Sequence, residues 1–499
     1  MHDSLLSTLA ARAREFPHCE AIVGDEVVTY GELWRRVQVV ASWLRDQSVA
    51  RIALEGANCV AWVVADLAAW QAGIVTIPMA PFFSAAQRNH VLASAGVDGI
   101  VSCVADLGPS VEGLRLQRLP TARSKHALPD GVCKITFTSG TTGTPRGVCL
   151  DGRKLEAVTR ALAHRIHTAP SLMASVDTHF TMLPLATLLE NVAGIYLPLS
   201  LGKRIALHSG AAIGLTGSSG LDPAQLLRAL HAARPNSLIV LPQILHALVA
   251  AAERGLRPPD SLRFIAVGGA KTPAALLHRA LAAGLPVYEG YGLSECASVV
   301  ALNAPGAIRM GSVGRPLDHV QVRVRDGAIE VAGNVFIGYL GQEATPRDGW
   351  LDTGDRGHFD EDGFLYVTGR RKNVLITGFG RNVSPEWIEG ELALAPSVRD
   401  VLVLGDGRPR LAAIVVPTSG ADAAQIAADL GRVNAALPDY ARIGRFIVAD
   451  EPFSPGNGLL TDNGRPRREA IADRYAESID ALYAESDVSP LPEIVHDLL

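Results

Sequence analysis

The sequence predicts an α/β fold. A large N-terminal domain of several subdomains, with layered α/β sheets and a small β-barrel-like part, precedes a small α+β C-terminal domain. Two observations predict it. Short β-branched runs alternate with Ala- and Leu-rich helical windows through about the first 300 residues, which is typical of α/β layers. From about Gly311 onward, segments of strict apolar–polar alternation take their place. The length of 499 residues fits two to four domains at about 100–200 residues each.

The N-terminal elements follow from the spacing of apolar residues. A strand is expected over residues 26–30 and a helix over 31–44, where apolar side chains recur every three or four positions. Residues 60–79 are the longest apolar stretch, but Asp66 and Gln71 interrupt it, so a buried helix followed by a strand fits better than a membrane span. Further buried strands are expected over 73–78, 237–241 and 263–267, with a helix over 223–233.

The second half of the chain has a different texture. Residues 320–324 and 328–331 alternate strictly and predict antiparallel strands. A domain boundary is expected near Gly369, which begins a run with three cations, so the predicted domains are 1–370 and 371–476. The C-terminal domain is expected to hold helices over 385–394 and from 421, and strands over 398–404 and 411–416. Residues 477–499 form a tail to which the sequence assigns no role.

Composition narrows the class of protein. The formal net charge is −5 and the pI is near 6.3, which argues against a basic nucleic-acid surface. The six cysteines include no C-x-x-C pair, so neither a disulfide scaffold nor a zinc site is indicated. The start lacks the basic region of a signal peptide. We therefore expect a cytoplasmic enzyme, monomeric or homodimeric, with neither a transmembrane segment nor a nucleic-acid partner.

Residues 134–148 are the most informative stretch. A strand-like run ends at Thr138, and positions 139–148 then hold three glycines and four hydroxyl residues. Glycines let backbone N–H groups turn toward an anion, hydroxyls add donors, and Arg146 adds a fixed charge. The stretch predicts a phosphate-binding loop, although it is neither the G-x-x-x-x-G-K-[ST] loop nor G-x-G-x-x-G.

With this loop and four further motifs in order, the sequence resembles the adenylate-forming superfamily of acyl- and aryl-CoA synthetases, peptide-synthetase adenylation domains and luciferases. The resemblance covers nearly the whole chain and is closest in motif to the fatty acyl ligases. The motifs are Thr138–Gly147, Tyr291–Glu295, Trp350–Asp355 with Gly369–Arg370, Gly380–Glu389 and Asn463–Arg468.

The resemblance implies that ATP and a carboxylic acid give acyl-AMP, after which a thiol, from CoA or from the phosphopantetheine of a carrier protein, gives a thioester. Glu295 is then expected to hold Mg²⁺ with Thr138, and Glu295, Arg465 and Arg146 to be catalytic. The implied hinge of a mobile C-terminal domain is Lys372, with Gly378 and Gly380 beside the thiol tunnel. The implied nucleotide-binding residues are Thr138, Ser139, Gly140, Thr141, Thr142, Gly143, Gly269, Ala270, Tyr291, Gly292, Ser294, Asp355 and Arg370.

Two departures concern arginine. Arg146 and Arg465 stand where the superfamily usually has lysine, in a chain whose 46 basic residues include only 6 lysines. Three interpretations of Arg465 stay open: it does the work of the lysine, the enzyme adenylates slowly but forms the thioester well, or the chain is a catalytically weak nucleotide-binding paralogue.

The acid is less well defined. Residues 179–190 lack the aspartate that binds a substrate ammonium in amino-acid-activating relatives, so an α-amino acid is not expected. Thr187 replaces the histidine of the fatty acyl ligases, and small residues nearby fit an aliphatic tail as well as a bulky aryl or polyketide acid. The leading function is an acyl-CoA synthetase; the alternatives are a stand-alone ligase that loads an acyl carrier protein and the weak paralogue.

Overall fold

The structure is a computed structural model. It describes residues 4–81, 83, 85–103, 110–120, 128–139, 145–167, 176–216, 220–270, 272–342, 349–370, 375–376, 382–406, 408, 410–437, 441–483 and 495–497.

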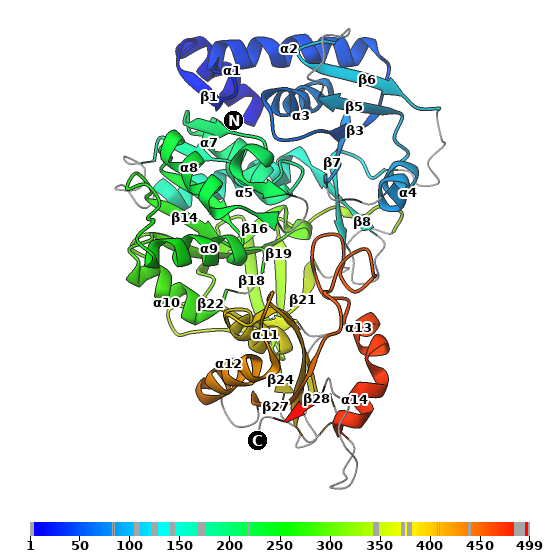
Figure 1. Ribbon diagram of the computed structural model, residues 1–499. Helices are drawn as coiled ribbons and strands as arrows, with labels where there is room; N and C mark the ends of the chain where they lie inside the picture. Colours follow the sequence, from blue (N-terminus) through cyan, green and yellow to red (C-terminus); the bar gives the residue numbers. More distant parts are fainter. Residues whose placement is uncertain are drawn as a thin grey trace.

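Two large sheets form the framework of the N-terminal part (Figure 1). The first has nine strands in the order β17 (Arg315–Pro316), β16 (Ser298–Leu302), β15 (Val287–Leu293), β14 (Phe264–Val267), β13 (Ser237–Val240), β9 (Thr178–Phe180), β10 (Arg204–Leu207), β1 (Glu20–Gly24) and β2 (Val28–Thr29). The second has seven, in the order β20 (Gly338–Tyr339), β8 (Pro145–Asp151), β7 (Val132–Ser139), β4 (Val75–Pro78), β3 (Arg51–Glu55), β5 (Gly99–Cys103) and β6 (Leu114–Arg118). The inner strands run parallel, as buried α/β strands do.

A third, antiparallel sheet takes the place expected for the β-barrel-like part. Its order is β18 (Val320–Arg325), β19 (Ala328–Gly333), β21 (Trp350–Phe359) and β22 (Leu365–Arg370). Apolar side chains of these strands pack against β16 around a small core that includes Val300, Ile329 and Leu365. Two short pairs complete the strands outside the C-terminal sheet: β11 (Leu215–Thr216) with β12 (Gly220–Leu221), and β23 (Leu375–Ile376) with β24 (Asn382–Val383).

Helices cover these sheets. Those of the N-terminal part are α1 (Leu5–Glu15), α2 (Tyr30–Asp46), α3 (Val60–Ala72), α4 (Ala85–Ala95), α5 (Gly152–His167), the π-helix η1 (Glu190–Tyr196), α7 (Leu197–Ser200), α8 (Pro223–Ala233), α9 (Pro242–Glu253), α10 (Ala274–Ala282) and the 3₁₀ turns η2 (Ala211–Ile213) and η3 (Ser294–Cys296). None of the helices among the described residues combines the length and the apolar character that a membrane crossing requires.

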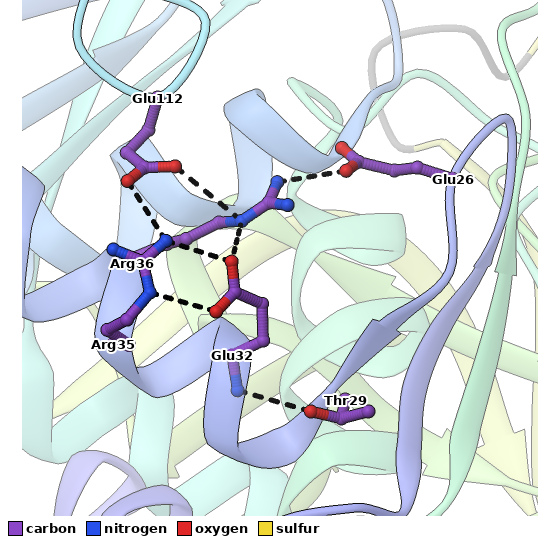
Figure 2. Close-up of polar contacts among 6 residues, drawn as sticks. All are labelled: Glu26, Thr29, Glu32, Arg35, Arg36 and Glu112. Carbon is purple, nitrogen blue, oxygen red and sulfur yellow. Dashed lines mark hydrogen bonds and ion pairs between the residues drawn. The ribbon is translucent and has the colours of Figure 1, made fainter.

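Helix α2 shows how local sequence sets an element. The Thr29 hydroxyl accepts from the N–H of Glu32 and caps the helix, while Leu33, Val37 and Leu44 bury one face completely. On the exposed face, Arg36 donates to Glu26 at 3.0 Å and to Glu32 at 2.9 Å, and Arg35 reaches Glu112 at 3.1 Å (Figure 2). This network ties α2 to the β1–β2 turn and to the segment before β6.

The C-terminal part is a separate α+β unit, drawn from dark yellow through orange to red in Figure 1. Its sheet has the order β25 (Val398–Leu404), β26 (Leu411–Pro417), β27 (Ile443–Val448) and β28 (Val495–Asp497), and its helices are α11 (Pro385–Leu392), α12 (Ala423–Ala436), α13 (Arg468–Arg474) and α14 (Ala476–Tyr483). Part of the tail without a predicted role therefore belongs to this unit: Leu482 of α14 is buried in its core, and β28 extends its sheet.

The predicted elements agree closely with the observed ones. The helix over 223–233 and the strand over 398–404 coincide with α8 and β25, and residues 60–79 divide into α3 and β4. The strand expected over 26–30 is shorter, because Tyr30 already begins α2 behind its Thr29 cap. The predicted domain limits stay predictions.

Candidate functional site

A β-hairpin presents the predicted phosphate loop. Strands β7 and β8 are antiparallel, and Thr138 pairs directly with Arg146. Gly140, Thr141, Thr142 and Gly143 lie outside the described residues, as does the side chain of Ser139. The strands therefore bring both ends of the loop together.

A buried lysine anchors the hairpin in the core. The ammonium of Lys134 on β7 donates to Asp66 Oδ1 at 2.7 Å and to the Tyr196 hydroxyl at 2.8 Å, and the side chain is only 3% exposed. Asn191 completes the group by accepting from Lys134 and donating to Asp66 at 3.0 Å. A buried charge is tolerated only when paired in this way, so the strand that carries the loop has a fixed position.

The Arg146 guanidinium is held by two side chains from the segment after β19. Its Cζ lies 3.7 Å from the centre of the Tyr339 ring, and Nη2 donates to Gln342 Oε1 at 3.0 Å. The Tyr339 hydroxyl in turn donates to Glu295 Oε1 at 2.8 Å. Tyr339 and Gln342 were not among the predicted site residues.

Glu295 lies in a strained turn. It is the middle residue of η3. The two residues that follow η3, Ala297 and Ser298, have φ values of 58° and 116°. Side-chain-bearing residues rarely adopt such values, and strain of this kind collects at functional sites. The turn also requires Gly292, because a Cβ there would come within 1.8 Å of the Ser298 carbonyl oxygen.

The predicted ribose site is built from two sheets. The Tyr291 hydroxyl of β15 donates to Asp355 Oδ2 of β21 at 2.6 Å. Burial, with the charge of Asp355, raises the pKa of Tyr291 well above its usual range, so the hydroxyl keeps its proton. Asp355 is 4% exposed and pairs across the strands with Arg370, whose side chain lies outside the described residues.

A tight turn in the C-terminal part carries Arg465. The Arg465 N–H donates to the Thr461 hydroxyl oxygen at 3.0 Å, and the Thr461 N–H donates to the Arg465 carbonyl at 2.8 Å. Gly464 has a φ of 77°, which closes the turn. Just beyond it, Arg468 donates to both oxygens of Glu389 on α11, at 2.6 and 2.5 Å. Thr461 is a further residue that sequence reasoning missed.

One cleft of about 2950 Å³ brings these segments together. The predicted residues that line it are Thr138, Arg146, Gly269, Ala270, Tyr291, Gly292, Ser294, Glu295, Asp355 and Arg465. Arg465 reaches it on the segment between β27 and α13, which Figure 1 shows rising from the C-terminal part toward the rest of the molecule. The predicted hinge Lys372 and tunnel residues Gly378 and Gly380 lie outside the described residues.

A second part of the cleft is apolar. Its walls include Leu162 and Ile166 of α5 and Leu197 of α7. Beside them, the segment from Leu183 to Leu185 is fixed by Asn58, which donates to the Leu183 carbonyl at 2.9 Å and accepts from the Leu185 N–H at 2.8 Å. The cleft therefore has both polar and apolar lining residues.

Comparison with known proteins places this site in a family. Residues 9–340 match the AMP-binding enzyme family, and residues 372–487 match its C-terminal domain. The chain belongs to the AMP-binding enzyme family. Membership confirms the predicted superfamily, the α/β fold class and the class of enzyme, an AMP-forming ligase of carboxylic acids and thiols.

Members of the AMP-binding family similar to this chain include named CoA ligases. Feruloyl-CoA synthase of Amycolatopsis sp is 32% identical over 454 residues, which cover 82% of this chain and 88% of that protein. Long-chain-fatty-acid–CoA ligase FadD15 of Mycobacterium tuberculosis (strain ATCC 25618 / H37Rv) is 27% identical over 572 residues, with 91% and 92% covered.

Solved structures share the family fold. The anthranilate CoA ligase AuaEII in complex with anthranoyl-AMP has a TM-score of 0.76 at 19% identity, covering 96% of this chain and 98% of that one. O-succinylbenzoate CoA synthetase from Bacillus subtilis, in complex with ATP and magnesium ion, has a TM-score of 0.72 at 23% identity, covering 93% and 98%.

Proposed function

We propose that this ligase joins a carboxylic acid to CoA in two steps at the cleft. In the first, a carboxylate oxygen of the acid attacks the α-phosphorus of ATP, and pyrophosphate leaves. In the second, the sulfur of CoA loses its proton and attacks the acyl carbon, and AMP leaves. The observation that supports this most is that Thr138, Glu295 and Arg465, from three distant segments, line one cleft.

We assign ATP to the polar region of the cleft. Backbone at the end of β7, with the Thr138 hydroxyl and Arg146, would hold the β- and γ-phosphates. Gly269 and Ala270 leave room for adenine beside Tyr291, and Asp355 would accept from the ribose hydroxyls. Because the Tyr291 hydroxyl already fixes Asp355, that carboxylate is oriented before the nucleotide binds.

The residues present fit Mg²⁺. Among the described residues no three His, Cys, Asp or Glu side chains gather into a metal cluster. Mg²⁺ suits such a site, since it binds through one or two carboxylates together with phosphate oxygens and water. Glu295 and the Thr138 hydroxyl are hard oxygen ligands among the residues that line the cleft. A bound Mg²⁺ would neutralise charge that develops on the phosphates.

Arg465 is assigned the role that lysine has in similar ligases. Its turn is closed by two hydrogen bonds to Thr461 and held in the domain by the Arg468–Glu389 pair. A cation fixed in this way would stabilise negative charge between carboxylate and α-phosphate during the first step. Lys372 as hinge, and Gly378 and Gly380 as tunnel residues, complete the proposal.

We propose that the acid has a large apolar body. The apolar region lined by Leu162, Ile166 and Leu197 supports this proposal, as do relatives named for feruloyl and long-chain fatty acids. Thr187, at the position of the usual histidine, also lines the cleft, and a threonine takes less space there. Aliphatic and aromatic bodies both suit such walls.

Acid-dependent release of pyrophosphate tests this function. A panel of long aliphatic, arylpropenoic, benzoic and short acids is incubated with ATP and Mg²⁺, and acyl-AMP is trapped with hydroxylamine. We expect the long and aryl acids to react and Glu295→Gln to abolish the signal, while Asp362→Asn, on the exposed β21–β22 turn, leaves it unchanged. Release of pyrophosphate with no acid of the panel would overturn the proposal. CoA and a phosphopantetheinylated carrier protein are then compared as acceptors.

A further inference from the structure

The segment from Phe336 to Leu340 joins two parts of the proposed ATP site through its backbone. The Phe336 N–H donates to the Glu295 carbonyl at 2.6 Å. Three and four residues later, Tyr339 pairs with Val148 of β8, and the Leu340 N–H donates to the Gly147 carbonyl at 2.8 Å. The segment is therefore bonded at one end to the turn of Glu295 and at the other to the strand that carries Arg146.

The Tyr339 side chain repeats this connection at the functional groups. Its ring lies under the Arg146 guanidinium, 3.7 Å from Cζ, and its hydroxyl donates to Glu295 Oε1 at 2.8 Å. Phe336 packs edge-on against the same ring, with 4.8 Å between centroids, and so limits its rotation. In this orientation the ring makes both contacts.

We propose that Tyr339 is a positioning residue that couples the phosphate loop to the magnesium ligand. This inference rests on the proposed function of Glu295. The hydroxyl holds Oε1 of Glu295, a residue that would bind Mg²⁺, and the ring supports the Arg146 guanidinium. The phosphates and the metal would then meet groups whose separation is already set.

The same geometry explains an arginine at position 146. A planar guanidinium lies flat on an aromatic ring and still donates sideways, here to Gln342 at 3.0 Å. An ammonium on a flexible stem concentrates its charge at one point and lacks this flat face. Arginine at this position therefore has a use beyond the general abundance of arginine in the chain.

Metal binding tests the hydroxyl separately from the ring. Mn²⁺ is titrated, by electron paramagnetic resonance, into the full-length enzyme saturated with a non-hydrolysable ATP analogue. Tyr339→Phe keeps the ring and removes the hydroxyl, and we expect the Kd for Mn²⁺ to rise about tenfold, as for loss of a hydrogen bond to a charged group. Tyr339→Leu also removes the platform of Arg146. We expect it to weaken metal-free binding of the analogue about fivefold by calorimetry, which Tyr339→Phe leaves unchanged.

A matched control removes a hydroxyl from another tyrosine–carboxylate pair. The Tyr366 hydroxyl lies 3.4 Å from Asp360 Oδ2 on the β21–β22 hairpin, and Tyr366→Phe is expected to leave the Kd for Mn²⁺ unchanged. In the double variant with Glu295→Gln, Tyr339→Phe is expected to add nothing further, because it acts through Glu295. A further additive loss would overturn the coupling.

The arms also separate this inference from the proposed function. An unchanged Kd in Glu295→Gln would remove Glu295 from the metal site and with it the proposed function of that residue. A tenfold rise in Glu295→Gln with no change in Tyr339→Phe would overturn the role of Tyr339 alone. Thermal unfolding of each variant checks that the fold is kept.

Discussion

Arg146 and Arg465 both stand where the resemblance to the adenylate-forming superfamily implies lysine, and the molecule contacts them in different ways. Arg146 is held by its side chain: the guanidinium lies on Tyr339 and donates to Gln342. The backbone of Arg465 is held in a turn by Thr461. The Arg465 carbonyl accepts from the Thr461 N–H, and the Arg465 N–H donates to the Thr461 hydroxyl oxygen. The first belongs to a strand of the seven-stranded sheet, the second to the C-terminal unit.

The difference teaches which arginine depends on its shape. At position 146 the contacts use the flat face and the edge of a guanidinium, which lysine lacks. At position 465 the turn fixes where a long side chain begins, and any cation of similar length would be presented to the cleft. Arginine at position 146 therefore has a structural reason beyond the arginine-rich composition.

The largest effect is expected from removing the charge on the turn. Arg465→Ala should slow formation of acyl-AMP by on the order of 10²-fold or more, as loss of a preorganised charge does. Single-turnover release of pyrophosphate measures it. Thioester formation from supplied acyl-AMP and CoA is the internal control and should change little. An unchanged rate of acyl-AMP formation would show that Arg465 takes no part in this step. The remaining interpretations would be an enzyme that adenylates slowly and a catalytically weak nucleotide-binding paralogue.

A smaller effect is expected from loosening the turn while keeping its cation. Thr461→Val removes the oxygen that accepts from the Arg465 N–H and donates to Asn463 at 2.6 Å. A misplaced Arg465 should lower the single-turnover rate about tenfold. Thr159→Val is the matched control, since that hydroxyl bonds only within α5, to the Leu155 carbonyl at 2.7 Å. Equal rates in both variants would mean that the Thr461 hydroxyl does not position Arg465.

Exchanging each arginine for lysine tests the comparison directly. Arg465→Lys should keep the rate of acyl-AMP formation within about threefold, because the turn still presents a cation. Arg146→Lys should raise the KM for ATP about fivefold, because the ammonium loses the flat contact with Tyr339. Steady-state kinetics with ATP varied at saturating acid and Mg²⁺ separates the two. The reverse order of effects would contradict the distinction between side-chain and backbone support.

Sequence reasoning reached the parts of this site that short motifs encode. The hairpin around Thr138, the turn of Glu295 and the strand of Asp355 each carry a local pattern, and the helix over 223–233 follows from its periodicity alone. Five segments in order were enough to predict the family and its fold.

Sequence reasoning did not predict the contacts between motifs. Tyr339 lies in a two-residue strand that has no periodicity, and its partners Arg146 and Glu295 are distant in the sequence. Thr461 precedes its motif and gives no signal of its own. Lys134 was visible as a lysine in a strand, but its three buried partners come from α3 and η1. Tertiary packing decides which distant residues make contact, and these contacts cannot be predicted from a single sequence.

The smallest effect concerns two carboxylates that contact residues near these arginines: Glu295 bonds to Tyr339, and Glu389 bonds to Arg468. Glu295 accepts from a neutral hydroxyl, whereas Glu389 accepts from the cation Arg468, and burial nevertheless raises the pKa of Glu389 above its usual range, against the opposing effect of Arg468. A carboxyl with a raised pKa stabilises the fold below its unfolded pKa and loses that contribution as pH rises through the folded value. Glu389→Gln removes this titration, so its free energy of unfolding should gain slightly on that of the wild type as pH rises above the ordinary pKa of a glutamate, about 4.3. Urea unfolding of both proteins as a function of pH measures the difference. A wild type that instead gains on the variant as pH rises would show that the ion pair with Arg468 outweighs burial.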